Sequence, residues 1–410
     1  MLLKQIVEYH LPALYMQLIK MKNCINGTRI NTTYKTDNGV VNIPSPSHRN
    51  TFFGYYDKTP FNPEDENLLV FHANNQNPQK KPSCKTITDI LLHNRGKNSY
   101  SIIGKTTAWN WQQGARLHWI DSSHIVYNCY DKEKQLPRCK RVNVFNLEEK
   151  TYDYPLQESF SNKFFLSLDY STLNKTRPDY GYRNSVRKNN YTDNSVFMVS
   201  YKNGKSEKLF DISDILNLLG LGNIQLRKSK ARINHIMVTP DGEKFIFLFR
   251  YIHKYKLQHI LMMYDCKNSS LKVLLKDNMI SHYCWIDNDN ILFWGIVNSI
   301  GDYYRLNTDI PEKAVSLKTG MTDGHPWLYN DNTVISDTYP DNTRHRKLIR
   351  IDLDKLSVTE LLRSYESCKF IGETRCDLHP HPSPSGKWIH YDSINTGQRL
   401  LSLYEVNDDS

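Results

Sequence analysis

The sequence predicts an all-β protein, a seven-bladed β-propeller with an N-terminal helix. Two observations support this fold class. A degenerate unit recurs along the chain at a spacing typical of propeller blades, and each unit contains several short alternating runs that suit the strands of one sheet. The expected strands do not alternate with long helices, as parallel α/β folds require. Two stacked β-sandwiches remain the alternative arrangement.

The recurring unit consists of an aromatic or apolar residue, a turn built from Pro, Asp, Asn, Ser or Gly, and an alternating β run. It occurs at residues 61–72, 119–128, 238–249, 285–294, 327–337 and 382–393, and an atypical copy lies at 164–182. The turns fall near residues 63, 121, 170, 240, 287, 330 and 385, on average about 54 residues apart, which suits a blade with loop insertions. The pattern therefore assigns residues 45–405 to the propeller and residues 1–44 to a helix and lead-in.

Two segments outside the repeats carry helical patterns. Residues 2–22 have apolar side chains at helical spacing, with Pro12 at a kink. We expect this helix to pack across the propeller, and peripheral contact with a membrane surface is the alternative. Residues 211–219 predict a short capped helix that ends at Gly220, in the longest insertion between repeats.

The composition indicates a globular protein without a transmembrane segment. Charged residues make up 23% of the chain, and no window approaches ~18 uncharged apolar residues. Lys4, Glu8 and His10 interrupt the apolar N-terminal stretch, so it does not resemble a signal peptide. The eight cysteines form no CxxC pair, which favours reduced thiols. We therefore expect a cytoplasmic location.

The net charge favours an anionic partner. It is +10, from 53 Lys and Arg against 43 Asp and Glu, and basic residues gather at 138–141, 227–232 and 344–347. No helix-turn-helix, zinc-finger or RNA-binding signature accompanies these runs, so we do not expect a nucleic acid partner.

Four histidines occupy the same place in successive repeats. His235, His282, His325 and His379 each lie just before the turn of a unit. If the units are blades, these imidazoles converge at one end of the central channel, as a metal or proton-transfer site requires. His381 is two residues beyond His379 in an extended segment, so both side chains could chelate one ion. Imidazoles with oxygen ligands suit Mn, Fe, Ni or Zn better than Ca or Mg.

Several segments resemble the oligogalacturonate lyase family of seven-bladed propellers and its relatives from bacterial polysaccharide gene clusters. They are "FFGYYDKTPFNP" (52–63), "WNWQQGARLHWI" (109–120), "RPDYGY" (177–182), "RINHIMVTPDG" (232–242), "DGHPWLYNDNTVISDTYPD" (323–341) and "RCDLHPHPSPSGKWIHYDS" (375–393). Their order along the chain implies the same fold over residues 50–395.

The resemblance also implies a site. It implies a divalent metal, manganese before others, held by His282, His379 and His381, with His235 as the general base. The lyase has a glutamine ligand three residues before the first His of the HPHP pair, where this chain has Cys376. A thiolate there would favour zinc. His325 is a candidate contact to the substrate or to a ligand.

Cleavage of a uronate polymer by β-elimination needs such groups. The base removes a weakly acidic proton next to a carboxylate, and a metal and an Arg neutralise the carboxylate. Arg232, three residues before His235, is the candidate Arg clamp. Candidate sugar contacts are Tyr55, Tyr56, Gln112 and Gln113, and the aromatic residues among them could equally fill the core.

These features predict a metal-dependent lyase acting on a uronate-containing acidic oligosaccharide or polysaccharide. The alternative is a non-catalytic propeller that binds an anionic glycan or a protein partner in bacterial surface polysaccharide biosynthesis, of capsule or O-antigen.

Overall fold

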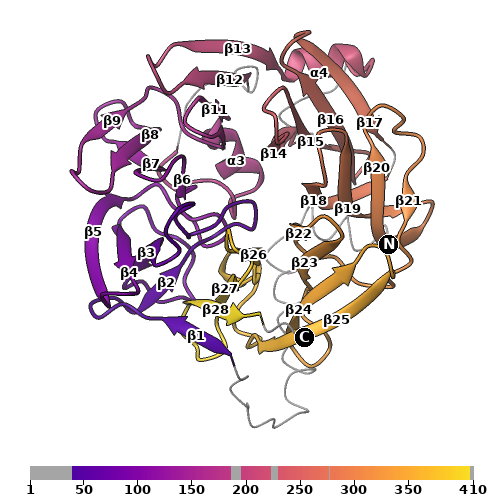
Figure 1. Cartoon of the computed structure of the whole chain (residues 1–410). Coiled ribbons are helices and arrows are strands. Elements are labelled where there is room, and N and C mark those ends of the chain that lie inside the picture. The colour runs from indigo at the N-terminus through magenta and orange to yellow at the C-terminus, as the bar shows by residue number, and fades with distance from the viewer. Residues whose placement is uncertain (1–38, 186–194, 223–229, 277, 407–410) are drawn as a thin grey trace.

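Seven sheets stand in a ring around a central axis, and each consists of four antiparallel strands (Figure 1). The computed structural model describes residues 39–185, 195–222, 230–276 and 278–406. Within these ranges six of the sheets are formed by four consecutive strands, and the seventh combines the first strand with the last three. The predicted seven-bladed propeller is therefore confirmed, and two stacked sandwiches are excluded. The expected helix over residues 2–22 lies outside the described residues.

In the first four blades the innermost strand comes first (Figure 1). Blade one comprises β2 (Asn50–Phe52), β3 (Leu68–Asn74), β4 (Thr88–Asn94) and β5 (Ser99–Thr106). Blade two comprises β6 (His118–Trp119), β7 (His124–Asp131), β8 (Leu136–Asn143) and β9 (Glu149–Thr151). Blade three comprises β10 (Glu158–Phe160), β11 (Phe164–Ser167), β12 (Ser195–Ser200) and β13 (Ser206–Asp211). Blade four comprises β14 (Arg232–Val238), β15 (Lys244–His253), β16 (Lys256–Asp265) and β17 (Ser270–Leu275).

The last three blades complete the ring. Blade five comprises β18 (Met279–Trp285), β19 (Asn290–Val297), β20 (Ile300–Asn307) and β21 (Val315–Ser316). Blade six comprises β22 (Trp327–Asn330), β23 (Thr333–Asp337), β24 (His345–Asp352) and β25 (Ser357–Tyr365). Blade seven comprises β26 (His381–Pro382), β27 (Trp388–Ser393), β28 (Leu400–Glu405) and β1 (Val40–Ile43). A 3₁₀ turn, η2 (Gly372–Thr374), precedes this blade.

The two ends of the propeller meet in blade seven. Strand β1 pairs antiparallel with β28, from Val40 opposite Tyr404 to Ile43 opposite Leu401. This pairing joins the first and last parts of the propeller and covers the free edge of β28. The propeller therefore begins at Val40, before the expected boundary at residue 45.

The predicted turns agree with the structure except in blade three. There the turn between the first two strands spans residues 161–163, whereas residue 170 begins the helix α3 (Tyr170–Thr176). The Asp169 side chain accepts a hydrogen bond from the Ser171 amide and caps this helix. Residue types that favour turns also favour helix N-caps, and this overlap explains the wrong assignment.

The predicted helix near residue 211 is confirmed as α4 (Ile212–Leu218). Asp211 is its N-cap and forms a capping box with Asp214. No helix in the described ranges is both long and apolar enough to cross a bilayer.

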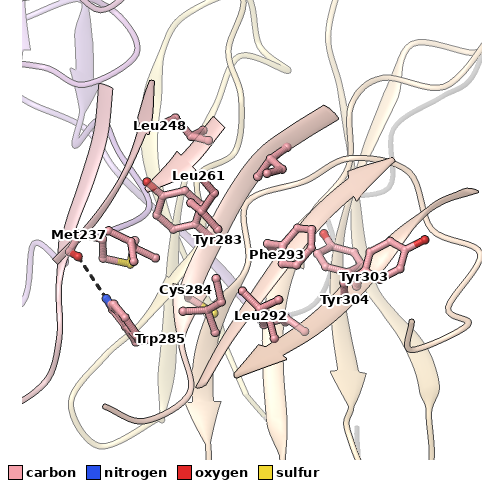
Figure 2. Close-up of a cluster of buried hydrophobic side chains, with 14 of the residues drawn as sticks. Met237, Leu248, Leu261, Tyr283, Cys284, Trp285, Leu292, Phe293, Tyr303 and Tyr304 are labelled. Atoms are coloured by element: carbon pink, nitrogen blue, oxygen red, sulfur yellow. Dashed lines mark hydrogen bonds between the residues drawn. The ribbon is translucent and has the colours of Figure 1, made fainter. Parts of the chain in front are cut away.

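Apolar side chains fill the space between the blades (Figure 2). Leu292 and Phe293 of β19 and Tyr303 of β20 are fully buried. The Trp285 indole Nε1 donates a hydrogen bond of 3.2 Å to the Met237 carbonyl and so ties blade five to blade four (Figure 2). These contacts fix neighbouring blades against each other and thereby fix the positions of the innermost strands.

Candidate active site

Local backbone irregularities shape the inner strands where the four repeated histidines lie. His235 and His282 lie at irregularities in the register of β14 and β18, as in β-bulges. His325 and His379 lie two residues before β22 and β26. His235 and His379 have left-handed backbones, with φ of 55° and 50°. Bulges and left-handed residues re-aim side chains at a cost in free energy, and they gather at functional sites.

The four imidazoles form a continuous cluster, called the imidazole cluster below. Ring centroids lie 5.2 Å apart for His235 and His282, 4.0 Å for His282 and His325, and 4.3 Å for His325 and His379. All four residues are at most 5% exposed. The structure thus brings together the four histidines that share a place in the sequence repeats.

Three residues of this region could hold a metal ion, and we call them the metal-capable group. They are His325, Asp377 and His379, whose potential ligand atoms lie within 4.8 Å of one another. Within the described residues the Nε2 atoms of His325 and His379 are buried and have no hydrogen-bond partner. Burial lowers the pKa of both imidazoles well below the usual value, so they are neutral, the form that binds metals.

Asp337 orients this group. Its Oδ1 lies 2.7 Å from His325 Nδ1 and accepts the His325 amide at 2.8 Å, while its Oδ2 accepts the His379 amide at 3.1 Å. A carboxylate on Nδ1 fixes the tautomer that leaves Nε2 free, an arrangement common around metal-binding histidines. Burial raises the pKa of Asp337 to about 6.

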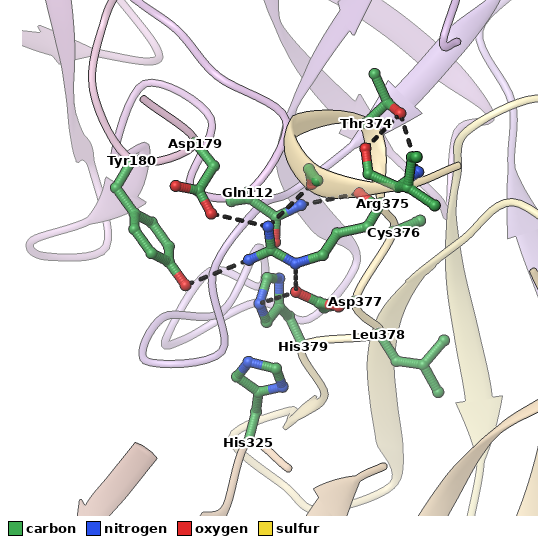
Figure 3. A network of polar contacts seen from close by, with 12 residues as sticks. Gln112, Asp179, Tyr180, His325, Thr374, Arg375, Cys376, Asp377, Leu378 and His379 are labelled. Carbon is green, nitrogen blue, oxygen red and sulfur yellow. Dashed lines mark hydrogen bonds and ion pairs between the residues drawn. The ribbon is translucent and has the colours of Figure 1, made fainter. Parts of the chain in front are cut away.

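Two guanidinium groups hold Asp377 as a carboxylate, and Figure 3 shows that of Arg375. Arg375 Nε lies 2.8 Å from Asp377 Oδ2, and Arg346 lies 2.9 Å from Oδ1. They hold the pKa of Asp377 well below its usual range against the opposing effect of burial. Arg375 also pairs with Asp179 at 2.8 Å, as Figure 3 shows. The carboxylate is thus fixed and charged beside His379.

His381 has neighbours that differ from those of His379. Its ring packs on Trp327 at 4.5 Å and on His390 at 5.9 Å, and its Nδ1 lies 2.7 Å from the Pro382 carbonyl. The expectation that His379 and His381 point the same way assumed an extended backbone. The left-handed φ of His379 breaks that alternation.

Cys376 points into an apolar cluster with Phe370 and Ile394. Burial raises the pKa of its thiol to about 12, so without a metal the thiol keeps its proton. The next residue, Asp377, belongs to the metal-capable group instead. Sequence reasoning missed Asp377 and Asp337, although a signal was present for Asp377: it lies two residues before His379, just as Asp323 lies two residues before His325.

His235 is held from two sides. The Tyr55 hydroxyl lies 2.5 Å from His235 Nδ1, and the Tyr283 hydroxyl donates to the His235 carbonyl. Burial lowers the pKa of the His235 imidazole well below its usual value. At neutral pH the imidazole is therefore uncharged, and one of its ring nitrogens has a lone pair, as a general base needs.

Arg232, the candidate clamp, is buried beside other guanidinium groups. Its Nη1 donates to the Lys230 carbonyl at 3.2 Å. Burial, with Arg177 and Arg250 nearby, lowers its pKa to about 9. Among the described residues neither Arg232 nor Arg250 forms an ion pair with a carboxylate. This part of the molecule thus has positive charge that an anion would balance.

The remaining candidates are buried. Tyr55 is 4% and Tyr56 1% exposed, and the Tyr56 hydroxyl donates to the Tyr283 carbonyl at 2.8 Å. Gln112 Nε2 donates to the Arg375 carbonyl at 2.8 Å (Figure 3). The backbone amide of Gln113 donates a hydrogen bond to Asn110 Oδ1 at 2.8 Å. Both glutamine Oε1 atoms are buried without a partner in the described structure.

Comparison with known proteins shows a shared fold. An oligogalacturonate lyase in complex with manganese superposes with a TM-score of 0.65 at 13% sequence identity, over 92% of this chain and 96% of the other. An oligogalacturonate lyase from Vibrio parahaemolyticus gives a TM-score of 0.64 at 13% identity, over 92% and 97%. No family model and no curated protein matches the chain. The fold implied by the sequence resemblance is therefore confirmed.

Proposed function

We propose that the protein is a metal-dependent lyase that cleaves a uronate-containing acidic oligosaccharide or polysaccharide by β-elimination. The observation that carries this proposal is the convergence of the imidazole cluster with Asp377. Two buried imidazoles whose Nε2 atoms have no hydrogen-bond partner in the described structure, next to a fixed carboxylate, suit a divalent cation. The fold shared with oligogalacturonate lyases supports the same reaction class.

The metal-capable group would hold the ion, and His282 lies next to it. Two imidazoles and a carboxylate fit manganese, zinc or another first-row divalent cation. Manganese is our first choice because the similar lyase structure contains it. When bound, such an ion neutralises the uronate carboxylate and stabilises the enolate that forms next to it.

His235 is the proposed base. Its imidazole lies next to His282 in the cluster, on the side away from Asp377, and is neutral because burial disfavours the imidazolium. Removing the proton next to the carboxylate requires a lone pair close to the metal-capable group but not used by it. His235 meets this condition, since Nδ1 lies against Tyr55 and not against a carboxylate.

Arg232 and Arg250 supply charge for the sugar carboxylates. Neither has a carboxylate partner in the described ranges, and burial lowers the pKa of both. A neighbouring uronate would restore the balance of charge, and guanidinium groups bind carboxylates in a bidentate manner. The net charge of +10 favours the same acidic class of ligand.

Access to the imidazole cluster requires movement, since its four residues are at most 5% exposed. Some charged residues near the cluster are more exposed, with side-chain exposures of 15% for Asp323, 13% for Arg375 and 36% for Arg177. A sugar that displaces these groups would meet charged and hydrogen-bonding side chains first.

The same burial supports a second candidate function. A metal that is closed off from solvent could stabilise a propeller that binds an anionic glycan or a protein partner in surface polysaccharide biosynthesis without catalysis. A cytoplasmic location belongs to both proposals, and the seven described cysteines, all free thiols, support it.

Detection of the unsaturated product separates the two functions. Elimination creates a C4–C5 double bond that is conjugated with the carboxylate and absorbs ultraviolet light. Hydrolysis and simple binding create no such double bond. Incubation of the manganese-loaded protein with acidic oligosaccharides should produce this absorbance. Binding of the oligosaccharide without the absorbance would favour the non-catalytic function.

A further inference from the structure

Tyr55 and His235 form a close buried pair. The Tyr55 hydroxyl lies 2.5 Å from His235 Nδ1, and the two rings stack at 5.6 Å with an angle of 15° between their planes. The pair therefore places a phenol, which can donate a proton, against an imidazole nitrogen, which can accept one.

The same tyrosine reaches the metal-capable group. Its ring centroid lies 4.9 Å from that of His379 and 6.2 Å from that of His325. Tyr55 thus lies between the proposed base and the residues that would hold the sugar carboxylate. In a uronate, the carbon next to the carboxylate is C5 and the leaving oxygen is on C4, so a donor at this place is near both reacting atoms.

The loop that carries Tyr55 is held by hydrogen bonds to blade seven. Asp392 of β27 accepts hydrogen bonds from the Phe53 and Gly54 amides at 2.9 and 3.0 Å. Gly54 has a φ of 122°, and a Cβ there would lie 2.7 Å from the Gln113 carbonyl carbon. Only glycine fits this approach, so the backbone before Tyr55 has a defined position.

On the basis of the proposed function, we propose that Tyr55 is the general acid of the elimination, that it works with His235 on one face of the sugar ring, and that the substrate is therefore a 4-linked uronate with an equatorial O4. Glucuronate and mannuronate have this configuration. In them the C5 proton and O4 lie on the same face, whereas in galacturonate O4 is axial and lies on the opposite face. The Tyr55 oxygen and the adjacent His235 nitrogen can reach the C5 proton and O4 together only when both lie on the same face of the ring.

The proton transfers balance within the pair. The Tyr55 hydroxyl turns from Nδ1 to O4, the freed lone pair of His235 Nδ1 takes the C5 proton, and the electrons of the C5–H bond form the C4–C5 double bond. The C4–O4 bond breaks, its electron pair stays on O4, and O4 takes the phenol proton of Tyr55. The imidazolium then returns its Nδ1 proton to the Tyr55 phenolate across their hydrogen bond. The enzyme gains and loses no proton, which suits a site buried from solvent.

Substrate choice tests the one-face geometry. Size-matched oligomers of 4-linked mannuronate, glucuronate and galacturonate are incubated with the manganese-loaded protein, and the ultraviolet absorbance of the double bond is followed. We expect kcat/KM to be about 10²-fold higher for mannuronate or glucuronate than for galacturonate. Equal or faster cleavage of galacturonate would overturn the one-face inference and leave the lyase function intact. No double bond from any of the three would overturn both.

The variant Tyr55→Phe tests the acid role, because it removes the hydroxyl and keeps the ring. We expect kcat on the preferred oligomer to fall by about 10²–10⁴-fold with KM unchanged. Exchange of the C5 proton with deuterated solvent should persist, since His235 remains. A 4-deoxy-4-fluoro uronate, whose fluoride leaves without a proton, should react as fast as with the wild-type protein.

The control is Tyr201→Phe, which removes another fully buried hydroxyl, one that bonds to Ser159 in blade three. It should leave kcat unchanged. If Tyr55→Phe slows the fluoro compound as much as the oligomer, Tyr55 positions His235 and is not the acid, which overturns the proposal.

Discussion

Left-handed backbone at single residues sets the geometry of the candidate site. His235 and His379 both have positive φ, and a non-glycine residue in this conformation costs of order 1–3 kcal/mol. Surrounding contacts maintain it, such as the hydrogen bond from the Tyr283 hydroxyl to the His235 carbonyl. This conformation also decides which substitutions test the site, because Asn tolerates it better than Ala does.

His235→Asn and His379→Asn should fail in different ways. Removing the base should lower kcat by about 10²–10⁴-fold with bound manganese unchanged, whereas removing a ligand should lower metal content and activity together. Metal analysis and kinetics on the same preparations measure both effects. Equal loss of metal in the two variants would make His235 a ligand and assign the base elsewhere.

Asp392 should make stability depend on pH. Burial raises its pKa from 3.8 to about 7, so between these values the folded protein holds a proton that the unfolded chain has released. Stability therefore falls as pH rises through this window. Asp392→Asn removes the ionisable group, and its free energy of unfolding should fall less steeply, by about 1.4 kcal/mol per pH unit. Urea unfolding across the window measures both slopes, and parallel slopes would contradict the assignment.

At the level of single residues, the sequence predicted part of the candidate site. The repeats identified the four histidines of the imidazole cluster because each blade places equivalent residues at the same end of the channel. A search for histidines alone missed Asp337 and Asp377, although Asp377 precedes His379 just as Asp323 precedes His325. The direction of His381 could not be predicted, because it depends on the φ of His379. Backbone strain at one residue leaves no pattern in a single sequence.

Among the elements, the short strand β1 has the largest structural role for its length. It supplies the outer strand of blade seven and pairs along its whole length with β28. Alternation predicts strands but not their distant partners, so the sequence analysis placed these residues in the lead-in. The repeats gave six of the seven blade turns, and the helix α3 was misread because Asp169 favours both a turn and a cap.

Two substitutions in β1 test this closure. Ile43 is 3% exposed and Val41 is 42% exposed on the same strand. We expect Ile43→Ala to lower the free energy of unfolding by about 2–4 kcal/mol and Val41→Ala by less than about 0.5 kcal/mol. Denaturant unfolding of both variants, followed by the same spectroscopic signal, measures the difference between their free energies of unfolding. Equal small effects would mean that β1 contributes little to holding the ring closed.

For the whole molecule, the ring of blades explains how distant residues come to share one site. Tyr55 from blade one, His235 from blade four, His325 from blade six and His379 from blade seven meet because the innermost strands surround one axis. Short repeats with a constant spacing predict this architecture well, since it depends on pattern and not on particular contacts. The chemistry at its centre depends on single side chains.

The measurement that tests the central claim most directly is double-bond formation as a function of metal. The protein is treated with chelator, reloaded with manganese, and incubated at each stage with 4-linked uronate oligomers of all three configurations, while ultraviolet absorbance is recorded. Our account predicts that absorbance rises with the reloaded protein, is absent after chelation, and is lost in His235→Asn. Tight manganese binding with no unsaturated product from any oligomer would contradict the lyase function.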